Sequence, residues 1–331
     1  MQRLRYALVA AMLAALVPTL AGATCGSANC FLTSSTDPVL GAGRTTLDLS
    51  YRYIPQDRKH SGTRSVSEVI VPAIDFETRT VVPDHHREYR TVNLLGQLDV
   101  AHGVAPNVTV AVAIPFYNQR VHEHDDDVHL GVDPAGEFTN GDGTTGFGDV
   151  AVNVRWAALV GTRHTVVLGG GLKTPTGEYK LRNSAGEIGE PTLMPGTGSW
   201  DILVSIMGTY MLAPPDLNMF ASLEVRHNGE NPLDYRMGDA RTLNVGVSWT
   251  ATNVWTLLLQ LNAREVERDE YIGAAILHTG GSYLYVTPGA RMKLSPKTSL
   301  YAHVQLPLVQ DVNETNLVPR YALQLGAAWL F

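Results

Sequence analysis

The chain has 331 residues, of which 44% are hydrophobic and 17% charged, enough for one large or two ordinary domains. Its mean hydropathy of −0.03 hides a strongly uneven distribution along the chain. The net charge of −7 argues against nucleic acid as a partner.

Residues 1–23 have the order of a secretory signal peptide. Arg3 and Arg5 precede an apolar run from Ala7 to Leu20, and small residues follow at positions 21–23. The run is shorter than the roughly 20 residues of a membrane-spanning helix, and Pro18 interrupts it. We therefore predict a cleaved export signal rather than an N-terminal membrane anchor.

Residues 24–44 form an N-terminal segment that contains the two cysteines of the chain, Cys25 and Cys30. Export to an oxidising compartment favours a local disulfide between them, with metal binding as the weaker alternative because two thiols do not close a zinc site. We expect this periplasmic N-terminal segment to lie in the lumen of the following domain or at its periplasmic mouth, with a disordered leader as the alternative.

The remainder, residues 45–331, alternates apolar and polar residues with a period of two. In Thr46 to Tyr53, for example, Leu47 and Leu49 share one face with two tyrosines, and Asp48 and Arg52 share the other. We predict about twelve strands, each near the length that crosses a membrane at a tilt. They are Thr46 to Tyr53, Tyr89 to Ala101, Val108 to Arg120, Phe147 to Ala158, Thr165 to Thr174, Trp200 to Leu212, Leu217 to His227, Arg241 to Thr250, Trp255 to Arg264, Ser282 to Leu294, Ser299 to Val309 and Leu317 to Phe331.

The connections between these strands alternate in length. Long polar segments such as Gln56 to Arg87, His122 to Gly146 and Pro175 to Thr197 follow odd-numbered strands, and short turns follow even-numbered ones. Outer-membrane barrels have this arrangement, with short turns in the periplasm and long loops outside. The sequence predicts an all-β, antiparallel, up-and-down barrel in the bacterial outer membrane with periplasmic termini. A soluble sandwich is the alternative, but it has no need to sort its connections by parity.

Three glycine-rich stretches in the middle of the chain resemble a known family. They are residues 145–150 (TGFGDV), 168–177 (LGGGLKTPTG) and 196–201 (GTGSWD). They resemble signatures of the outer-membrane barrels named after the meta-pathway of phenol degradation. The resemblance implies an outer-membrane barrel linked in some members to uptake of aromatic or other hydrophobic compounds, and it assigns no pore residue. The glycines also fit close strand packing and barrel curvature.

Polar side chains on the inward face of the predicted strands are candidates for lining the lumen. Twelve strands fall between the eight that side chains fill and the sixteen that leave an open aqueous channel, so we expect a narrow or occluded passage. The candidates are Asp48, Arg52, Asp99, Arg155, Lys173, Asp201, Glu224, Arg226, Gln260, Arg264, Arg291, Lys293, His303 and Gln305.

The second long connection carries groups that transition metals accept as ligands. The candidate set is His122, His124, Asp125, Asp127 and His129, with Asp84, His85 and His86 on the neighbouring loop. A solvated hydrophilic loop is the alternative. Neither an outer-membrane aspartyl protease nor a phospholipase is indicated, because the second carboxylate pair of the former and a specific Ser/His pair of the latter are not recognisable in the sequence. We predict no enzymatic activity and no cofactor.

The last strand ends in aromatic residues, and its Tyr321, Trp329 and Phe331 are similar to the signal that assembly machinery recognises in other barrels. We predict a channel or transporter for passive uptake of small, hydrophobic or aromatic molecules, with outer-membrane lipid and the barrel-assembly machinery as partners. The alternative is a structural barrel that binds a periplasmic redox or metal-handling protein.

Overall fold

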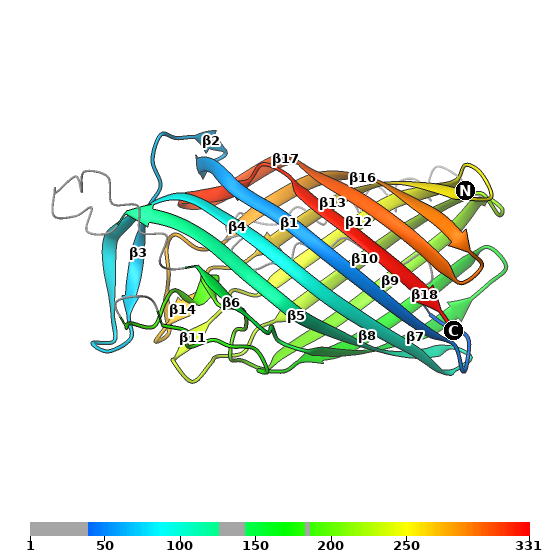
Figure 1. Ribbon diagram of the computed structural model, residues 1–331, viewed down its shortest axis with the longest axis horizontal. Coiled ribbons are helices and arrows are strands. Elements are labelled where there is room, and N and C mark those ends of the chain that lie inside the picture. The colour runs from blue at the N-terminus through cyan, green and yellow to red at the C-terminus, as the bar shows by residue number, and fades with distance from the viewer. Residues whose placement is uncertain (1–38, 126–142, 183–185) are drawn as a thin grey trace, which may run out of the picture.

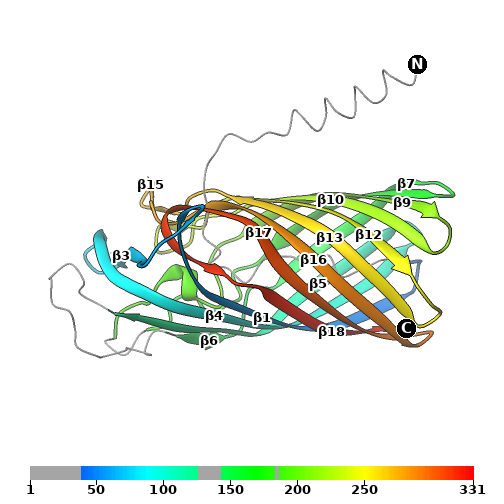
Figure 2. The same cartoon turned by 90° about the horizontal axis from the view of Figure 1, so that it is seen from above.

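The computed structural model describes residues 39–125, 143–182 and 186–331. They form a closed barrel of twelve antiparallel strands (Figures 1 and 2), so the predicted fold class is confirmed. The barrel strands are β1 (Thr45–Gly62), β4 (Thr80–Ala105), β5 (Val108–Asp125), β7 (Ala151–Val160), β8 (His164–Lys173), β9 (Asp201–Ala213), β10 (Leu217–His227), β12 (Ala240–Thr250), β13 (Trp255–Val266), β16 (Gly281–Ser295), β17 (Thr298–Pro319) and β18 (Ala322–Leu330). Among the described residues, no helix is both long and apolar enough to cross a bilayer.

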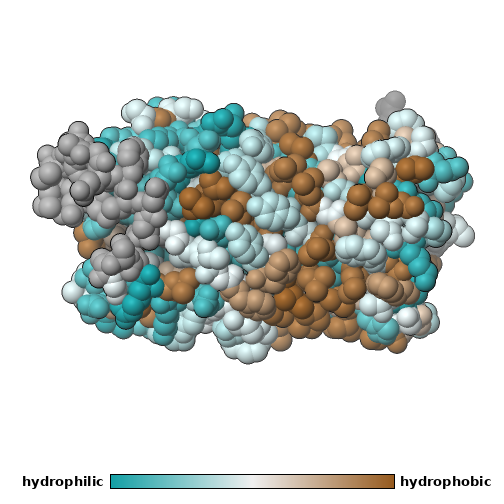
Figure 3. Space-filling model, in the orientation of Figure 1, coloured by the Kyte–Doolittle hydropathy of each residue, from teal (hydrophilic) through white to brown (hydrophobic). Residues whose placement is uncertain are grey.

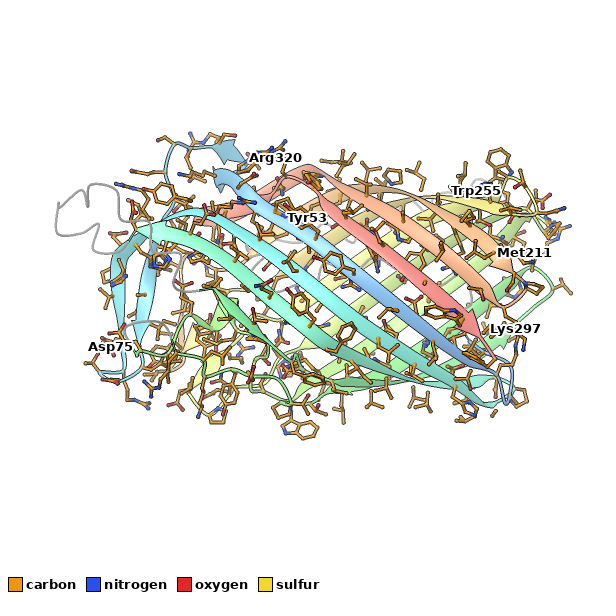
Figure 4. The ribbon with its side chains drawn as sticks, viewed as in Figure 1. Tyr53, Asp75, Met211, Trp255, Lys297 and Arg320 are labelled. Carbon is orange, nitrogen blue, oxygen red and sulfur yellow. The ribbon has the colours of Figure 1, made fainter. Side chains whose placement is uncertain are left out.

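The barrel closes where β1 pairs with β4 on one side and β18 on the other. Thr46 to Tyr53 run antiparallel to Leu330 to Leu323, and the same residues of β1 also pair with β4. Closure leaves no strand edge in the lipid, where an unpaired backbone group would cost several kcal/mol. Arg320, labelled in Figure 4, ion-pairs across this seam with Asp57 of β1 at 2.8 Å.

The chain reverses direction within β17. Asp311 pairs with Ser282 of β16, whereas Thr315 pairs with Ser61 of β1, and Glu314 between them has a positive φ of 44°. The connection between the predicted strands Ser299 to Val309 and Leu317 to Phe331 is therefore this reversal. The returning strand continues through β18, with an interruption before Ala322.

Side chains alternate between a polar interior and an apolar exterior. Along β12, Leu243, Val245 and Val247 are exposed, while Asn244 and Gly246 between them and Ser248 after them are buried. This inverts the pattern of a water-soluble sheet, because here the surrounding solvent is hydrocarbon. Figure 3 shows hydrophobic side chains gathered over one half of the visible face and hydrophilic ones at the opposite end.

The connections sort by length as predicted. Five turns of two to four residues join the strands at one end of the barrel, where Figure 4 shows Trp255 and Lys297. Longer connections lie at the other end, near Asp75. They contain β2 (Arg64–Ser65), β3 (Ile70–Asp75), β6 (Thr144–Gly146) and a small separate sheet of β11 (Tyr235–Arg236), β14 (Glu270–Tyr271) and β15 (Ala274–Ala275).

Several predicted boundaries were wrong; β5, for example, continues to Asp125 instead of ending at Arg120. The first long segment, Gln56 to Arg87, is largely strand, because β1 and β4 continue beyond the apolar part of the barrel and β3 pairs with β4. Conversely, residues 147–150 do not belong to β7, which begins at Ala151. Asp149, in this segment, does not pair with a neighbouring strand. Its carboxylate instead accepts hydrogen bonds from the backbone of Gly177 and Thr197.

Candidate channel lumen

A cavity of about 440 Å³ lies inside the barrel. Eight of the predicted inward-facing residues border it: Asp48, Arg52, Asp99, Arg155, Lys173, Glu224, Arg226 and Arg291. They come from strands around most of the barrel, because every second residue of each strand points inward. The cavity is therefore a common space rather than a pocket of one hairpin.

The other predicted residues lie elsewhere. Gln260, Arg264, His303 and Gln305 are buried in the interior, and none of them borders this cavity. Asp201 is 1% exposed and ion-paired to Lys173 at 3.0 Å. Lys293 is exposed near the short-turn end of β16, so it lies away from the cavity wall.

One part of the cavity wall is charged and internally bonded. The hydroxyl of Tyr301 donates to Asp48 Oδ1 at 2.5 Å, and the Gln97 amide donates to both carboxylate oxygens of Asp99 at 2.9 and 2.8 Å. The Arg291 guanidinium lies 5.3 Å from the centre of the Tyr301 ring. Six basic and four acidic side chains border the cavity in total, which leaves an excess of positive charge on its wall.

Another part of the wall is apolar and built from small side chains. Ala111 and Ala113 of β5, Ala151 of β7, Val167 of β8 and Leu203 of β9 all border the cavity. Small residues on adjacent strands leave room that longer side chains would fill. The cavity thus offers apolar surface and hydrogen-bonding groups to the same occupant.

The connection between β8 and β9 folds into the barrel and narrows it. Its short helical turn η3 (Pro191–Leu193) and the following Met194 and Pro195 reach the cavity. The Asn118 amide of β5 donates to the Pro195 carbonyl at 2.6 Å, and the Thr144 hydroxyl donates to the Leu193 carbonyl. We call residues 174–200 the inward loop; residues 183–185 within it are outside the described range.

A buried ionic cluster holds the two ends of the inward loop. Lys173 Nζ lies 2.7 Å from Asp149 Oδ2 and 3.0 Å from Asp201 Oδ2. Asp149 also accepts hydrogen bonds from the backbone N–H groups of Gly177 and Thr197, both at 2.8 Å. We call Asp149, Lys173 and Asp201 the loop anchor.

The three glycine-rich stretches meet at the loop anchor. A Cβ atom at Gly177 would lie 2.8 Å from Gly196 Cα and 2.8 Å from the Gly148 carbonyl carbon, too close for any side chain. These backbone segments can therefore lie this close together only because glycine has no Cβ atom. Asp149 was not among the predicted site residues, although its place in one of the three stretches was the available signal.

Among the residues that the structure describes, the predicted metal ligands do not all lie at one place. His122 and His124 are buried on the inner face of β5, whereas Asp125 accepts a hydrogen bond from Tyr89 and lies 4.0 Å from Arg87. Asp127 and His129 lie outside the described residues. Asp125 points away from the two histidines because alternate residues of one strand face opposite sides.

The two ends of the chain are described only in part. Cys25 and Cys30 lie outside the described residues, but Leu40 of the same segment borders the cavity, and its N–H donates to Thr109 Oγ1 at 2.8 Å. Phe331 at the other end is 62% exposed, and its backbone bonds to Thr45 at 2.8 and 3.2 Å. Trp329 pairs with Leu47, and the ring centre of Tyr321 lies 6.2 Å from that of Tyr53, with the two rings tilted by 41°.

Comparison with known proteins gives one family and a set of similar structures. The family model described as "Putative MetA-pathway of phenol degradation" matches residues 59–321. An outer membrane channel from Pseudomonas putida F1 has a TM-score of 0.60 at 13% identity, covering 88% of this chain and 97% of that one. The P. putida toluene transporter TodX is more distant, with a TM-score of 0.45 at 8% identity over 88% and 90% of the two chains. No curated protein sequence matches the chain.

Proposed function

Because the chain belongs to the family described as "Putative MetA-pathway of phenol degradation", we propose that it is an outer-membrane channel for passive uptake of small aromatic or other hydrophobic molecules. The barrel lies in the outer membrane. We propose further that its short turns and both termini face the periplasm, as in other barrels of that membrane.

The observation that carries this proposal is the mixed wall of the cavity. A volume of about 440 Å³ lies in the range of sites for small organic molecules. An aromatic ring can lie against Ala113, Ala151 and Leu203 and so lose water without losing hydrogen bonds. A hydroxyl or carboxylate on that ring can bond to Arg155 or Asn153, which border the same space. The excess of basic groups favours anionic over cationic solutes of equal size.

The inward loop makes the passage selective. It occupies part of the cross-section, and the loop anchor fixes it at both ends, so a solute must fit the remaining space. Conduction also requires that a solute bind weakly enough to leave again. We therefore expect slow permeation of small aromatic molecules and exclusion of oligosaccharides.

The proposal is tested in liposomes that contain the purified, folded barrel. Entry of phenol and benzoate is measured beside entry of a trisaccharide, and single-channel conductance is measured in planar bilayers. We expect faster entry of the two aromatic solutes than in protein-free liposomes, and no entry of the trisaccharide. A folded barrel that gives neither conductance nor aromatic entry would contradict the channel function.

Two further expectations stay predictions. Recognition of Phe331 by the barrel-assembly machinery is supported by its exposure at the end of β18. Binding of a periplasmic partner protein rests on Cys25 and Cys30, which lie outside the described residues.

A further inference from the structure

Two histidines and one glutamate from three separate segments converge at the end of the barrel that carries the long connections. His86 belongs to β4, His122 to β5, and Glu190 directly precedes η3 in the inward loop. One side-chain nitrogen or oxygen of each residue lies within 4.8 Å of the corresponding atoms of the other two. His86 Nε2 and Glu190 Oε1 are 2.7 Å apart. Nothing in the sequence brings Glu190 to this place, because more than sixty residues separate it from His122.

The imidazoles are buried and oriented. His86 is 3% and His122 1% exposed, so both rings have lost bulk water. His122 Nδ1 lies 2.8 Å from the hydroxyl of Thr91 on β4. When Nδ1 donates to this hydroxyl, the lone pair of the ring is on Nε2. Metal-binding histidines are commonly fixed by such a second bond from the other ring nitrogen.

We propose that His86, His122 and Glu190 form a binding site for a divalent transition-metal ion such as Zn²⁺. Two imidazoles and one carboxylate are a donor set that Zn²⁺ accepts with a fourth position left for water. With ligand distances of about 2.1 Å, tetrahedral ligand atoms lie roughly 3.4 Å apart. The 2.7 Å between His86 and Glu190 is shorter than this distance, and the 4.8 Å that encloses all three ligand atoms is longer, so binding would require the side chains to adjust. His124, whose ring centre is 4.8 Å from that of His122, is the nearest additional imidazole.

A bound ion would join the inward loop to the barrel wall at a further point, beside the loop anchor and the hydrogen bonds to Leu193 and Pro195. The loop anchor holds residues 149, 173 and 201, whereas this site holds Glu190, four and five residues before Met194 and Pro195 at the cavity. Occupancy by the metal would therefore restrict the part of the loop that narrows the lumen. This inference does not depend on which solute the channel carries.

The test is calorimetric titration of the folded, full barrel in detergent with Zn²⁺. We expect one ion per chain for the unaltered protein. Glu190→Gln and His122→Gln, which keep side-chain size, should each weaken binding by about a hundredfold or more, and Thr91→Val by about tenfold. His102→Gln is the matched control, because His102 is exposed at the opposite end of β4.

Two readouts separate metal binding from a simple ion pair between His86 and Glu190. Co²⁺ in place of Zn²⁺ should give the absorption of a low-symmetry site in the unaltered protein and lose it in Glu190→Gln. Heat-modifiable gel migration verifies that each variant is a folded barrel. The proposal is overturned if Zn²⁺ does not bind stoichiometrically, or if folded Glu190→Gln binds it as tightly as the unaltered protein. Either result would leave the permeation of aromatic solutes, and so the channel proposal, unaffected.

Discussion

Two parts of the barrel have similar outer faces and different interiors. Between β12, β13, β16 and β17 the interior is filled by hydrogen-bonded side chains. Asn262 donates to Asn244 Oδ1 at 2.6 Å and accepts from the Thr287 hydroxyl at 2.6 Å and from the Gln305 amide at 3.4 Å. Between β5, β7, β8 and β9 the inward residues are largely small, and the cavity lies against them.

This difference shows that the width of a twelve-stranded lumen is set by inward side chains and not by strand number alone. Both parts present Val and Leu to the lipid and keep the same strand pairing. In the filled part, the side chains of Asn244, Asn262, Thr287 and Gln305 are bonded to one another. Of these four residues, only Asn244 borders the cavity. In the open part, the space left by small residues is shared between the cavity and the inward loop.

The largest effect is expected from releasing the inward loop in the open part. Lys173→Met leaves Asp149 and Asp201 buried without their cation, which should cost about 3–5 kcal/mol of stability and free the loop ends. Single-channel conductance should rise severalfold, and the temperature at which the barrel unfolds on a heat-modifiable gel should fall.

Lys293→Met is the matched control, because Lys293 is exposed near the end of β16. It should change neither property. An unchanged conductance in folded Lys173→Met would show that the loop anchor does not hold the loop in the lumen.

A smaller effect is expected from making the open part resemble the filled part. Ala113→Phe places a large ring in the cavity, so benzoate entry into liposomes should fall severalfold, with a cost of about 1–3 kcal/mol in stability. Val152→Phe on the neighbouring β7 faces the lipid and should leave entry unchanged. Equal entry in both variants would indicate a route that avoids this cavity.

The smallest effect on permeation is expected in the filled part. Asn262→Leu removes the partner of Thr287 and Asn244, which should cost about 1–3 kcal/mol because their polar atoms stay buried. The unfolding temperature should fall while benzoate entry stays the same. Asn253→Leu, in the exposed turn before β13, is the control for the substitution itself. Faster benzoate entry with Asn262→Leu would mean that solutes also pass through the part of the interior between β12 and β17, which would contradict its description as filled.

The strands were predictable because the lipid imposes one pattern on them. An apolar residue at every second position is required wherever a strand crosses hydrocarbon, so β12 and β13 follow the expected ranges almost residue for residue. The pattern fails beyond the lipid. The ends of β1 and β4 are paired strands with polar residues on both faces, whereas β3 is apolar on both faces except at Asp75. In neither case does a period of two distinguish the strand from a loop.

The inward-facing residues were predictable, but their contacts were not. Parity alone indicates that Lys173 and Asp201 point inward. It does not indicate that Asp149 and Asp201 share Lys173 as their cation, because that contact depends on how the inward loop folds back. Glu190 was missed for the same reason: its neighbours come from β4 and β5, and no local pattern specifies them.

The pairing of β1 with β18 also constrains the order in which the barrel can form. The backbone of β1, the first strand of the barrel, is hydrogen-bonded on both sides only after β18, the last strand, has been added. Closing so long a loop is entropically slow, and until it happens β1 presents an open row of donors and acceptors. A newly exported chain of this kind must therefore be shielded from other chains until the barrel closes. The time that β1 stays unpaired on one side is set by how fast β18 reaches it.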